Sequence, residues 1–312
     1  MSTALAALWK TRHFSQNQRF WKKQSIKFRV TKIKPARPQK SAIAAKKGNS
    51  MNKLEKNMAD LLADLKKNYC VKAVKAEFES EELSFAQISS LKELAHSAGL
   101  EFTLKLGGCA PVRDFSEAQK LGIDNIVAPM IESRYAMEKF VNTAKSIFPP
   151  SDFSRKKLYI NLETVTGVQN FHEIASSPLF EALSGVVFGR SDYAASISAK
   201  SGTDSDFVFE AAEKVARKAL ATGKELIAGG NVTALSLPFF KKLQTTHLSG
   251  FETRKIIFSA PEALALPDIE AGILKAAEFE LLWLKNKCEN TNSLSTPDKN
   301  RIKMIEKRFN LG

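Results

Sequence analysis

The fold class of this chain is decided by the stretch Leu158-Tyr-Ile-Asn-Leu-Glu163-Thr-Val-Thr-Gly167. It begins as a short apolar run rich in strand-forming residues, and it ends in a carboxylate followed by a turn. Such a run is typical of a buried strand in a parallel sheet. In α/β barrels the chemically active residues lie at the carboxyl ends of these strands. Glu163 is therefore the first candidate for a functional side chain.

A second stretch repeats the pattern and reads Gly185-Val-Val-Phe-Gly189-Arg190-Ser191-Asp192. The carboxyl ends of neighbouring parallel strands meet at the same rim of a barrel, so Glu163 and Asp192 are expected to converge there. Two carboxylates from neighbouring strands could hold one divalent cation, because Mg²⁺ and similar cations prefer oxygen ligands. The functional interpretation depends on this pair.

Strand-like and helix-like stretches alternate over most of the chain, as in βα units, and eight such units close a (β/α)₈ TIM barrel. The expected strands are residues 71–78, 101–106, 125–130, 158–163, 185–189, 225–229, 246–248 and 255–258. The last two are too close together for a parallel crossover. Either one of them is not a barrel strand, or the barrel closes irregularly there. An open doubly wound sheet is the alternative, although no glycine-rich phosphate loop supports it.

The positive charge of the chain is concentrated at its start. The net charge is +14, but residues 1–50 contain 13 Lys or Arg and no Asp or Glu. Removing those 13 from the 47 basic residues leaves 34, against 33 acidic residues. The remainder is nearly neutral and gives no indication of nucleic-acid binding. Residues 1–50 could be a mis-called start before Met51, a transit peptide or a basic arm, and disorder or a loosely attached helix is expected there.

Composition also indicates in which cellular compartment the protein is expected. Three cysteines, Cys70, Cys109 and Cys288, lack the spacing of a metal site or a disulfide framework, which suits a reducing compartment such as the cytoplasm. An organelle is the alternative if residues 1–50 are a transit peptide. No apolar run reaches the ~18 residues of a membrane span, so no membrane partner is expected.

Four motifs follow four successive expected strands. They are Lys-Leu-Gly-Gly at 105–108, Val-Ala-Pro-Met-Ile-Glu-Ser at 127–133, Asn-Leu-Glu-Thr at 161–164 and Gly-Arg-Ser-Asp at 189–192. Together they resemble the HpcH/HpaI aldolase and citrate lyase family, which has a phosphoenolpyruvate/pyruvate-type TIM barrel. The resemblance covers about residues 70–260. It implies a metal-dependent carbon–carbon lyase that stabilises the enolate of pyruvate, oxaloacetate or an acyl thioester.

The resemblance also assigns roles by position. Glu163 and Asp192 correspond to the family's metal-binding carboxylates, for Mg²⁺ or Mn²⁺. Lys105 stands where the family places an arginine against the enolate oxygen, and a lysine keeps the charge but loses the bidentate fork. The histidine base of the aldolase branch is missing, and Glu77 or Glu79 could replace it only if burial raised its pKa.

A substrate-binding group is expected beside these residues. The backbone amides of Gly107 and Gly108 could approach a carboxylate or phosphate. Gly189 and Arg190 are also expected to bind substrate. Alternatively, Arg190 is a charged surface residue without a role in binding.

Structural roles compete with the chemical ones. Glu163 could cap a helix, Asp192 could be a turn or N-cap residue, and Lys105 could form only a structural ion pair with Glu77 or Glu163. Glu252 and Arg254 are expected to form an ion pair at the bottom of the barrel.

We expect a barrel at residues 51–290 and a C-terminal helical tail at 291–312. Its function would be a divalent-metal-dependent lyase or aldolase acting on a small 2-oxo acid or related hydroxy acid. A citrate-lyase-like acyl-CoA lyase and a non-catalytic oxo-acid-binding barrel are the alternatives. A homo-oligomer, a trimer or hexamer, is expected because residues 262–287 look like one long helix with more apolar surface than a barrel needs. In the related family this region packs against a neighbouring subunit.

Overall fold

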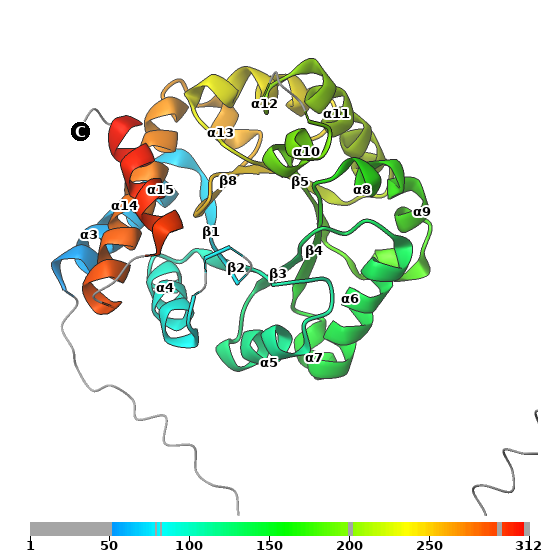
Figure 1. The fold of residues 1–312 in the computed structure, drawn as a ribbon, viewed down its shortest axis with the longest axis horizontal. Coiled ribbons are helices and arrows are strands. Elements are labelled where there is room, and N and C mark those ends of the chain that lie inside the picture. Colours follow the sequence, from blue (N-terminus) through cyan, green and yellow to red (C-terminus); the bar gives the residue numbers. More distant parts are fainter. Residues whose placement is uncertain (1–51, 79, 82, 199–201, 292–294, 309–312) are drawn as a thin grey trace, which may run out of the picture. The chain divides into compact units, whose positions relative to one another are not determined.

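The computed structural model describes residues 52–78, 80–81, 83–198, 202–291 and 295–308, so the expectations for residues 1–50 lie outside it. Within these ranges the chain forms a closed barrel of eight strands in sequence order, surrounded by helices (Figure 1). The expected TIM-barrel class with a C-terminal helical extension is confirmed. None of the described helices is both long and apolar enough to cross a membrane.

The strands lie close to their expected positions, with one exception. They are β1 (Val71–Glu77), β2 (Glu101–Lys105), β3 (Asn125–Ala128), β4 (Lys157–Leu162), β5 (Gly185–Gly189), β6 (Glu225–Gly229), β7 (Gly250–Glu252) and β8 (Ile256–Ser259). The expectation of a strand at 246–248 was wrong. The backbone N–H groups of Thr246 and His247 both donate to the carbonyl of Leu243, so these residues finish the preceding helix instead.

The barrel closes irregularly, because β8 runs opposite to the other strands. Neighbouring strands from β1 to β7 pair in parallel. In contrast, β8 is antiparallel to both β7 and β1. Only residues 253–255 separate β7 from β8, which is enough for a hairpin turn but not for a parallel crossover. The β7–β8 turn therefore lies at the mouth, where the seven parallel strands end.

Alternate strand residues face the barrel interior and the helices, as the pleat of a strand requires. An apolar layer fills the lower interior and consists of Ala73, Val127, Tyr159, Val187, Ile227 and Ile257. Outward-facing residues such as Val74, Leu104 and Ile160 join the larger core between strands and helices. The inward-facing residues nearest the mouth are polar. The candidate functional side chains therefore lie directly above the packed apolar layer.

The helices form the outer ring visible in Figure 1. They are α3 (Lys53–Tyr69), α4 (Phe85–Ser97), α5 (Val112–Leu121), α6 (Arg134–Ile147), α7 (Pro150–Phe153), α8 (Val165–Gln169), α9 (Phe171–Ala175), α10 (Arg190–Ser196), α11 (Asp206–Ala221), α12 (Leu237–Gln244), α13 (Glu262–Ala265), α14 (Ile269–Thr291) and α15 (Thr296–Arg308), with 3₁₀ turns η2 (Pro178–Ala182) and η3 (Ala234–Ser236).

The expected single helix over residues 262–287 is two helices. It breaks between α13 and α14, where Pro267 cannot continue a helix. Helix α14 packs along α3 and contacts α15, so most of its apolar side chains are buried within the chain. Leu274 remains 46% exposed. The apolar surface from which an oligomer was expected is thus largely covered by other helices of the same chain. The oligomeric state stays a prediction.

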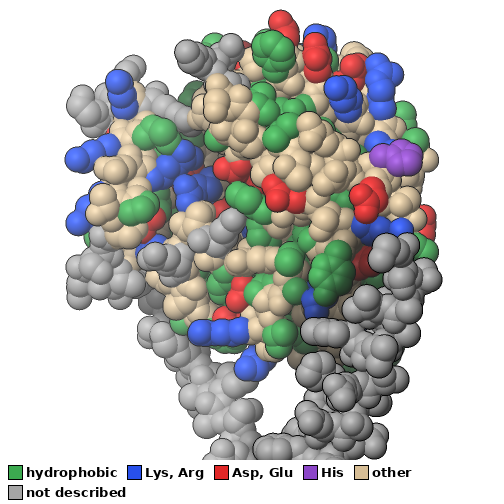
Figure 2. All heavy atoms as spheres, turned by 45° about the vertical axis from the view of Figure 1, so that its right-hand side comes forward, with side chains coloured by type: hydrophobic (Ala, Val, Ile, Leu, Met, Phe, Trp, Pro, Cys, Tyr) green, Lys and Arg blue, Asp and Glu red, His purple; other side chains and the backbone are tan. Residues whose placement is uncertain are grey.

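Several large hydrophobic side chains are exposed where helices begin, at the mouth end of the barrel. They are Val112, Tyr135, Phe207 and Leu235. On the face shown in Figure 2, hydrophobic side chains are interspersed with charged ones of both signs. Among the residues coloured there, no broad area carries a single charge.

Candidate active site at the barrel mouth

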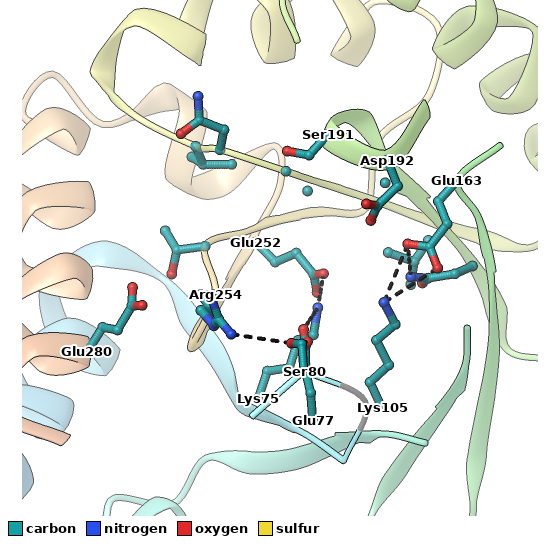
Figure 3. Close-up of a pocket in the computed structure, with 18 of the residues that line it drawn as sticks. Lys75, Glu77, Ser80, Lys105, Glu163, Ser191, Asp192, Glu252, Arg254 and Glu280 are labelled. Atoms are coloured by element: carbon teal, nitrogen blue, oxygen red, sulfur yellow. Dashed lines mark hydrogen bonds and ion pairs between the residues drawn. The ribbon is translucent and has the colours of Figure 1, made fainter. Parts of the chain in front are cut away.

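The mouth of the barrel holds a cavity of about 540 Å³, bounded by strand ends and by α14 and α15 (Figure 3). Its size suits a small-molecule site. Charged side chains of both signs line it, namely Lys75, Glu77, Lys105, Glu163, Asp192, Glu252, Arg254, Glu280 and Arg301. Val187 contributes to its floor from the apolar layer below.

Glu163 follows β4 directly, and its buried carboxylate is held from three sides. It accepts a hydrogen bond of 2.9 Å from the Met130 N–H and one of 2.8 Å from the Asn161 side-chain amide. The Lys105 ammonium lies 3.4 Å from each carboxylate oxygen. Glu163 does not cap the next helix, because the Thr164 hydroxyl does so by accepting from the Gly167 N–H.

Two backbone features make room for Glu163. Met130 has φ +48, a left-handed conformation that non-glycine residues rarely adopt, and there its N–H meets the carboxylate. Gly189, at the end of β5, lines the cavity, and a Cβ there would lie 2.7 Å from Glu163 Cβ and 2.8 Å from Oε2. Gly189 is therefore needed to let Glu163 occupy its position.

Asp192 reaches the same cavity from the first turn of α10. Its side chain is exposed, and Figure 3 shows the carboxylates of Asp192 and Glu163 both pointing into the cavity. The side-chain oxygen of Asn161 is buried beside them and has no hydrogen-bond partner among the described residues. Two carboxylates and an amide oxygen are hard ligands that fit Mg²⁺ or Mn²⁺, which keep several water ligands as well. In the described ranges no group of three or more His, Cys, Asp or Glu forms a metal cluster.

A buried chain of charges runs along the other wall. Lys75 Nζ lies 3.2 Å from Glu77 Oε1 and 2.5 Å from Glu252 Oε1. Burial alone would lower the pKa of Lys75, but Glu252 and Glu77 outweigh it and raise that pKa. Burial would likewise raise the pKa of Glu77, but Lys75, Lys105 and a hydrogen bond from Ser80 lower it to about 2. Glu77 is thus a paired carboxylate, and the raised pKa that a general base would need is not observed.

We expect this pairing of Glu77 to make stability depend on pH. Because its folded-state pKa is about 2 against an ordinary 4.5, its contribution is complete above pH 4.5 and is lost as the pH falls toward 2. The full difference amounts to about 3 kcal/mol. Urea unfolding between pH 7 and pH 2 should show a steeper loss for the wild type than for Glu77→Gln. Parallel pH profiles for the two proteins would contradict the assignment.

The expected substrate-binding group is only partly assembled. Gly107 and Gly108 do not line the cavity, and the Gly107 N–H donates to the carboxylate of Asp114 in α5 at 2.8 Å. Arg190 is neither at the cavity nor on the surface, since it is fully buried. Its guanidinium donates to the carbonyls of Gly229 at 3.0 Å and Gly230 at 2.6 Å, which fixes a loop that does line the cavity.

Arg190 owes this position to aromatic and acidic neighbours. Its guanidinium carbon lies 4.8 and 4.5 Å from the ring centres of Phe239 and Phe240, and it also pairs with Asp204. Burial lowers its pKa to about 10, still well above neutrality. Arg190 therefore stabilises the loop after β6 rather than contacting substrate.

Several cavity residues were not foreseen. Glu252 and Arg254 line the mouth and not the bottom, because β8 is reversed, and they pair with Lys75 and Glu81 rather than with each other. Lys75 could have been noticed, because the alternation of side chains along β1 puts it on the same face as Ala73 and Glu77. Glu280 and Arg301 come from α14 and α15, which local sequence patterns do not connect to the mouth.

An eight-strand barrel with acids at the ends of neighbouring strands defines the class of TIM-barrel enzymes that keep their active site at this mouth. Residues 110–256 match the model of the HpcH/HpaI aldolase/citrate lyase family, so this part of the chain is similar to that family. This match supports an enzyme of the lyase or aldolase type.

Solved structures agree on the fold. An HpcH/HpaI aldolase from Desulfitobacterium hafniense DCB-2 is similar with TM-score 0.52 and 17% identity, over 62% of this chain and 80% of that one. An HpcH/HpaI aldolase/citrate lyase family protein from Burkholderia cenocepacia J2315 has TM-score 0.51 and 13% identity, over 70% and 90%. At these identities the likeness shows the fold alone. A search of curated proteins finds no match.

Proposed function

We propose that the protein is a divalent-metal-dependent carbon–carbon lyase or aldolase acting on a small 2-oxo acid or related hydroxy acid. The observation that supports this most is that Glu163, Asp192 and Asn161 line one cavity, and that the side-chain oxygen of Asn161 has no hydrogen-bond partner among the residues described. The family match, to enzymes of the lyase or aldolase type, agrees with such a site. Glu163 and Asp192 would hold the cation. When bound, Mg²⁺ or Mn²⁺ supplies a Lewis acid that offsets negative charge on the substrate's carbonyl oxygen.

Residues of the chain itself would neutralise charge on the substrate, hold Glu163 in place and exclude water. Lys105 presents a buried ammonium at the end of β2, where it can neutralise charge that develops on the substrate. Its pairing with Glu163 holds the two groups 3.4 Å apart and orients both toward the cavity. Met130 and Asn161 keep the Glu163 carboxylate from turning away, because each donates to a different oxygen. The apolar floor excludes water from below.

Titration of the full chain with Mn²⁺, followed by deuterium uptake into the methyl group of pyruvate, tests this function. Asp192→Asn should weaken Mn²⁺ binding by about 100-fold with little loss of stability, because Asp192 is exposed. Asp206→Asn is the matched control, since Asp206 also lies in the first turn of a helix but does not line the cavity.

The two readouts separate the candidate functions. Mn²⁺ binding with deuterium uptake supports the lyase, whereas a wild type that binds no Mn²⁺ argues against it. Mn²⁺ and pyruvate binding without uptake would favour a non-catalytic oxo-acid-binding barrel. This second function is supported by the low pKa of Glu77 and by its ion pairs, because a general base would need a raised pKa.

A further inference from the structure

Lys105 has a buried carboxylate on either side of it at the mouth of the barrel. Its Nζ lies 3.4 Å from both Oε1 and Oε2 of Glu163, the acid that follows β4. On the other side, the parallel register of β1 and β2 makes Glu77 its direct neighbour. All three residues are buried and line the same cavity, and in the view of Figure 3 Lys105 lies between the two acids.

The Lys105 ammonium meets Glu163 where a cation would be bound. A carboxylate has about four lone-pair sites, and the N–H of Met130 and the amide of Asn161 each occupy one, on different oxygens. One site is left on each oxygen, and Lys105 Nζ is equally close to both oxygens. Two cations beside one buried carboxylate repel each other strongly, because little water screens them. Lys105 and a divalent cation therefore compete for Glu163.

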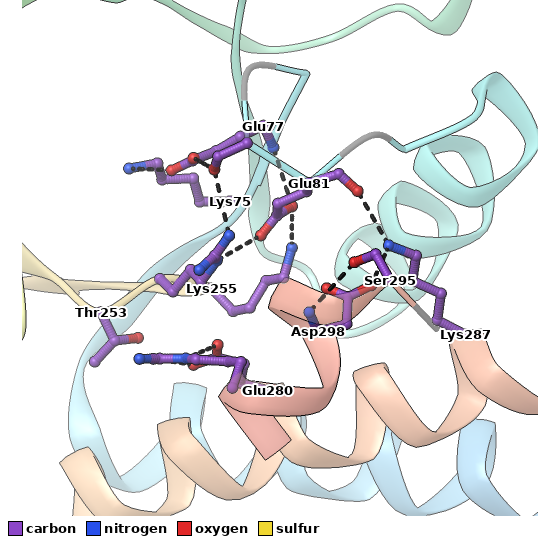
Figure 4. Close-up of polar contacts among 12 residues, drawn as sticks. Lys75, Glu77, Glu81, Thr253, Lys255, Glu280, Lys287, Ser295 and Asp298 are labelled. Atoms are coloured by element: carbon purple, nitrogen blue, oxygen red, sulfur yellow. Dashed lines mark hydrogen bonds and ion pairs between the residues drawn. The ribbon is translucent and has the colours of Figure 1, made fainter. Parts of the chain in front are cut away.

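Glu77 offers the Lys105 ammonium a second position. Its Oε1 lies 3.2 Å from Lys75 Nζ, its Oε2 accepts from the Ser80 hydroxyl at 2.7 Å, and its backbone N–H donates to Glu81 Oε2 at 3.2 Å (Figure 4). These bonds fix the carboxylate and leave it further lone pairs. Burial would raise the pKa of Glu77, but the charges of Lys75 and then of Lys105 lower it, so Lys105 already acts on this acid.

The Lys105 side chain can move between the two carboxylates while β2 stays in place. Lysine carries its ammonium on a flexible aliphatic stem with rotatable donors. Both carboxylates, by contrast, are held by other donors. Lys105 is thus the partner that can give way.

We propose that Lys105 is a built-in counter-cation of Glu163, which gives way to the divalent cation and turns its ammonium toward Glu77 and the substrate. This inference rests on the proposed function and adds an order of events to it. Paired with Lys105, the buried Glu163 charge is compensated. Displaced from Glu163, the ammonium becomes available to charge that develops on the substrate. Cation binding and the action of Lys105 on the substrate are thereby coupled.

Calorimetric titration of the full chain with Mn²⁺ tests the competition. Lys105→Met should bind Mn²⁺ about tenfold or more tightly than the wild type, the usual size of one interaction between charged groups. Its deuterium uptake into pyruvate should nevertheless fall about 100-fold, because an electrostatic contact to the substrate is lost. If Lys105 served only to orient Glu163, the same variant would bind Mn²⁺ more weakly.

Arg254→Gln is the control for general charge removal. Arg254 is another cation that lines the cavity, but it is partly exposed and pairs with Glu81 instead of Glu163. Its loss should change the Mn²⁺ affinity by less than about threefold, because water screens a partly exposed charge.

A double-mutant cycle tests the second position of the ammonium. Glu77→Gln should weaken Mn²⁺ binding by about tenfold, because Lys105 then has no second carboxylate and stays on Glu163. In the Lys105→Met background the same Glu77→Gln change should have less than about a threefold effect, since the two residues act on Mn²⁺ through each other.

The outcomes separate this inference from the proposed function. Where Lys105→Met does not fold, Lys105→Gln replaces it, since glutamine keeps a hydrogen-bond donor without the charge. Equal or weaker Mn²⁺ binding without the lysine, undiminished deuterium uptake, or the same Glu77→Gln effect in both backgrounds overturns the inference and leaves the metal site standing. Absence of Mn²⁺ binding in the wild type and in every variant refutes the proposed function, and this inference with it.

Discussion

Glu163→Gln is expected to weaken Mn²⁺ binding by at least about 100-fold and to abolish deuterium uptake into pyruvate. Loss of a group that merely orients a metal ligand typically costs about 10–100-fold, and Glu163 would be a ligand itself. Glutamine keeps the shape of the side chain but removes its charge. It also removes one of the two oxygens that accept from Met130 and Asn161. Calorimetric titration with Mn²⁺ measures the effect directly.

The control for this variant is Glu132→Gln. Glu132 is an exposed acid near the same strand ends, accepts from the Thr164 hydroxyl, and does not line the cavity. It should bind Mn²⁺ as the wild type does. Because Glu163→Gln removes a carboxylate charge beside the buried Lys105, the unfolding of this variant must be followed separately. Unchanged Mn²⁺ affinity in folded Glu163→Gln would remove the metal assignment.

The largest effect on stability is expected from Lys75→Met, which should lower the free energy of unfolding by about 3–5 kcal/mol. Methionine has a similar volume, so the loss comes from charge and not from a cavity. Lys75 pairs with Glu77 and Glu252, and all three residues are buried. Without it, Glu252 loses the one ion-pair partner shown in the described structure. Denaturant unfolding at pH 7 measures the change.

The double variant Lys75→Met/Glu252→Gln isolates the electrostatic origin of this loss. Glu252→Gln removes the carboxylate charge that Lys75→Met leaves without its ion-pair partner, so the double variant should recover part of the lost stability. The remaining acid, Glu77, still has Lys105 and Ser80 nearby. A double variant less stable than Lys75→Met alone would show that the loss is not caused by an unpaired carboxylate. Wild-type stability in Lys75→Met would show that the pairing contributes nothing.

Much of the barrel could be predicted from short-range patterns. The run ending at Glu163 and the run ending at Gly189 became β4 and β5, and their neighbouring ends place Glu163 and Asp192 at one cavity. Strand periodicity is a local property, and parallel neighbours necessarily end at the same rim. The functional roles of the two acids remain predictions that the Mn²⁺ titrations test.

The side chains beyond that pair depended on distant contacts. Arg190 sits next to a cavity-lining glycine in sequence, yet Phe239, Phe240 and Asp204 draw it into the interior. Gly107 was expected to offer its amide to a ligand, but Asp114 occupies that amide. Neither outcome can be read from neighbouring residues, because each depends on which partner the fold brings within hydrogen-bond distance.

The sequence by itself determined the barrel class, the first six strands and the acid that follows β4, because short apolar runs bounded by turns are enough to specify buried parallel strands. Only the tertiary structure decided the direction of β8, since strand polarity depends on which neighbours pair with it. That direction brings Arg254 to the mouth, and the folding of α14 and α15 against it adds Glu280 and Arg301. Charges from β1 and from the segment around β7 meet in one cavity because the barrel closes β1 onto β8.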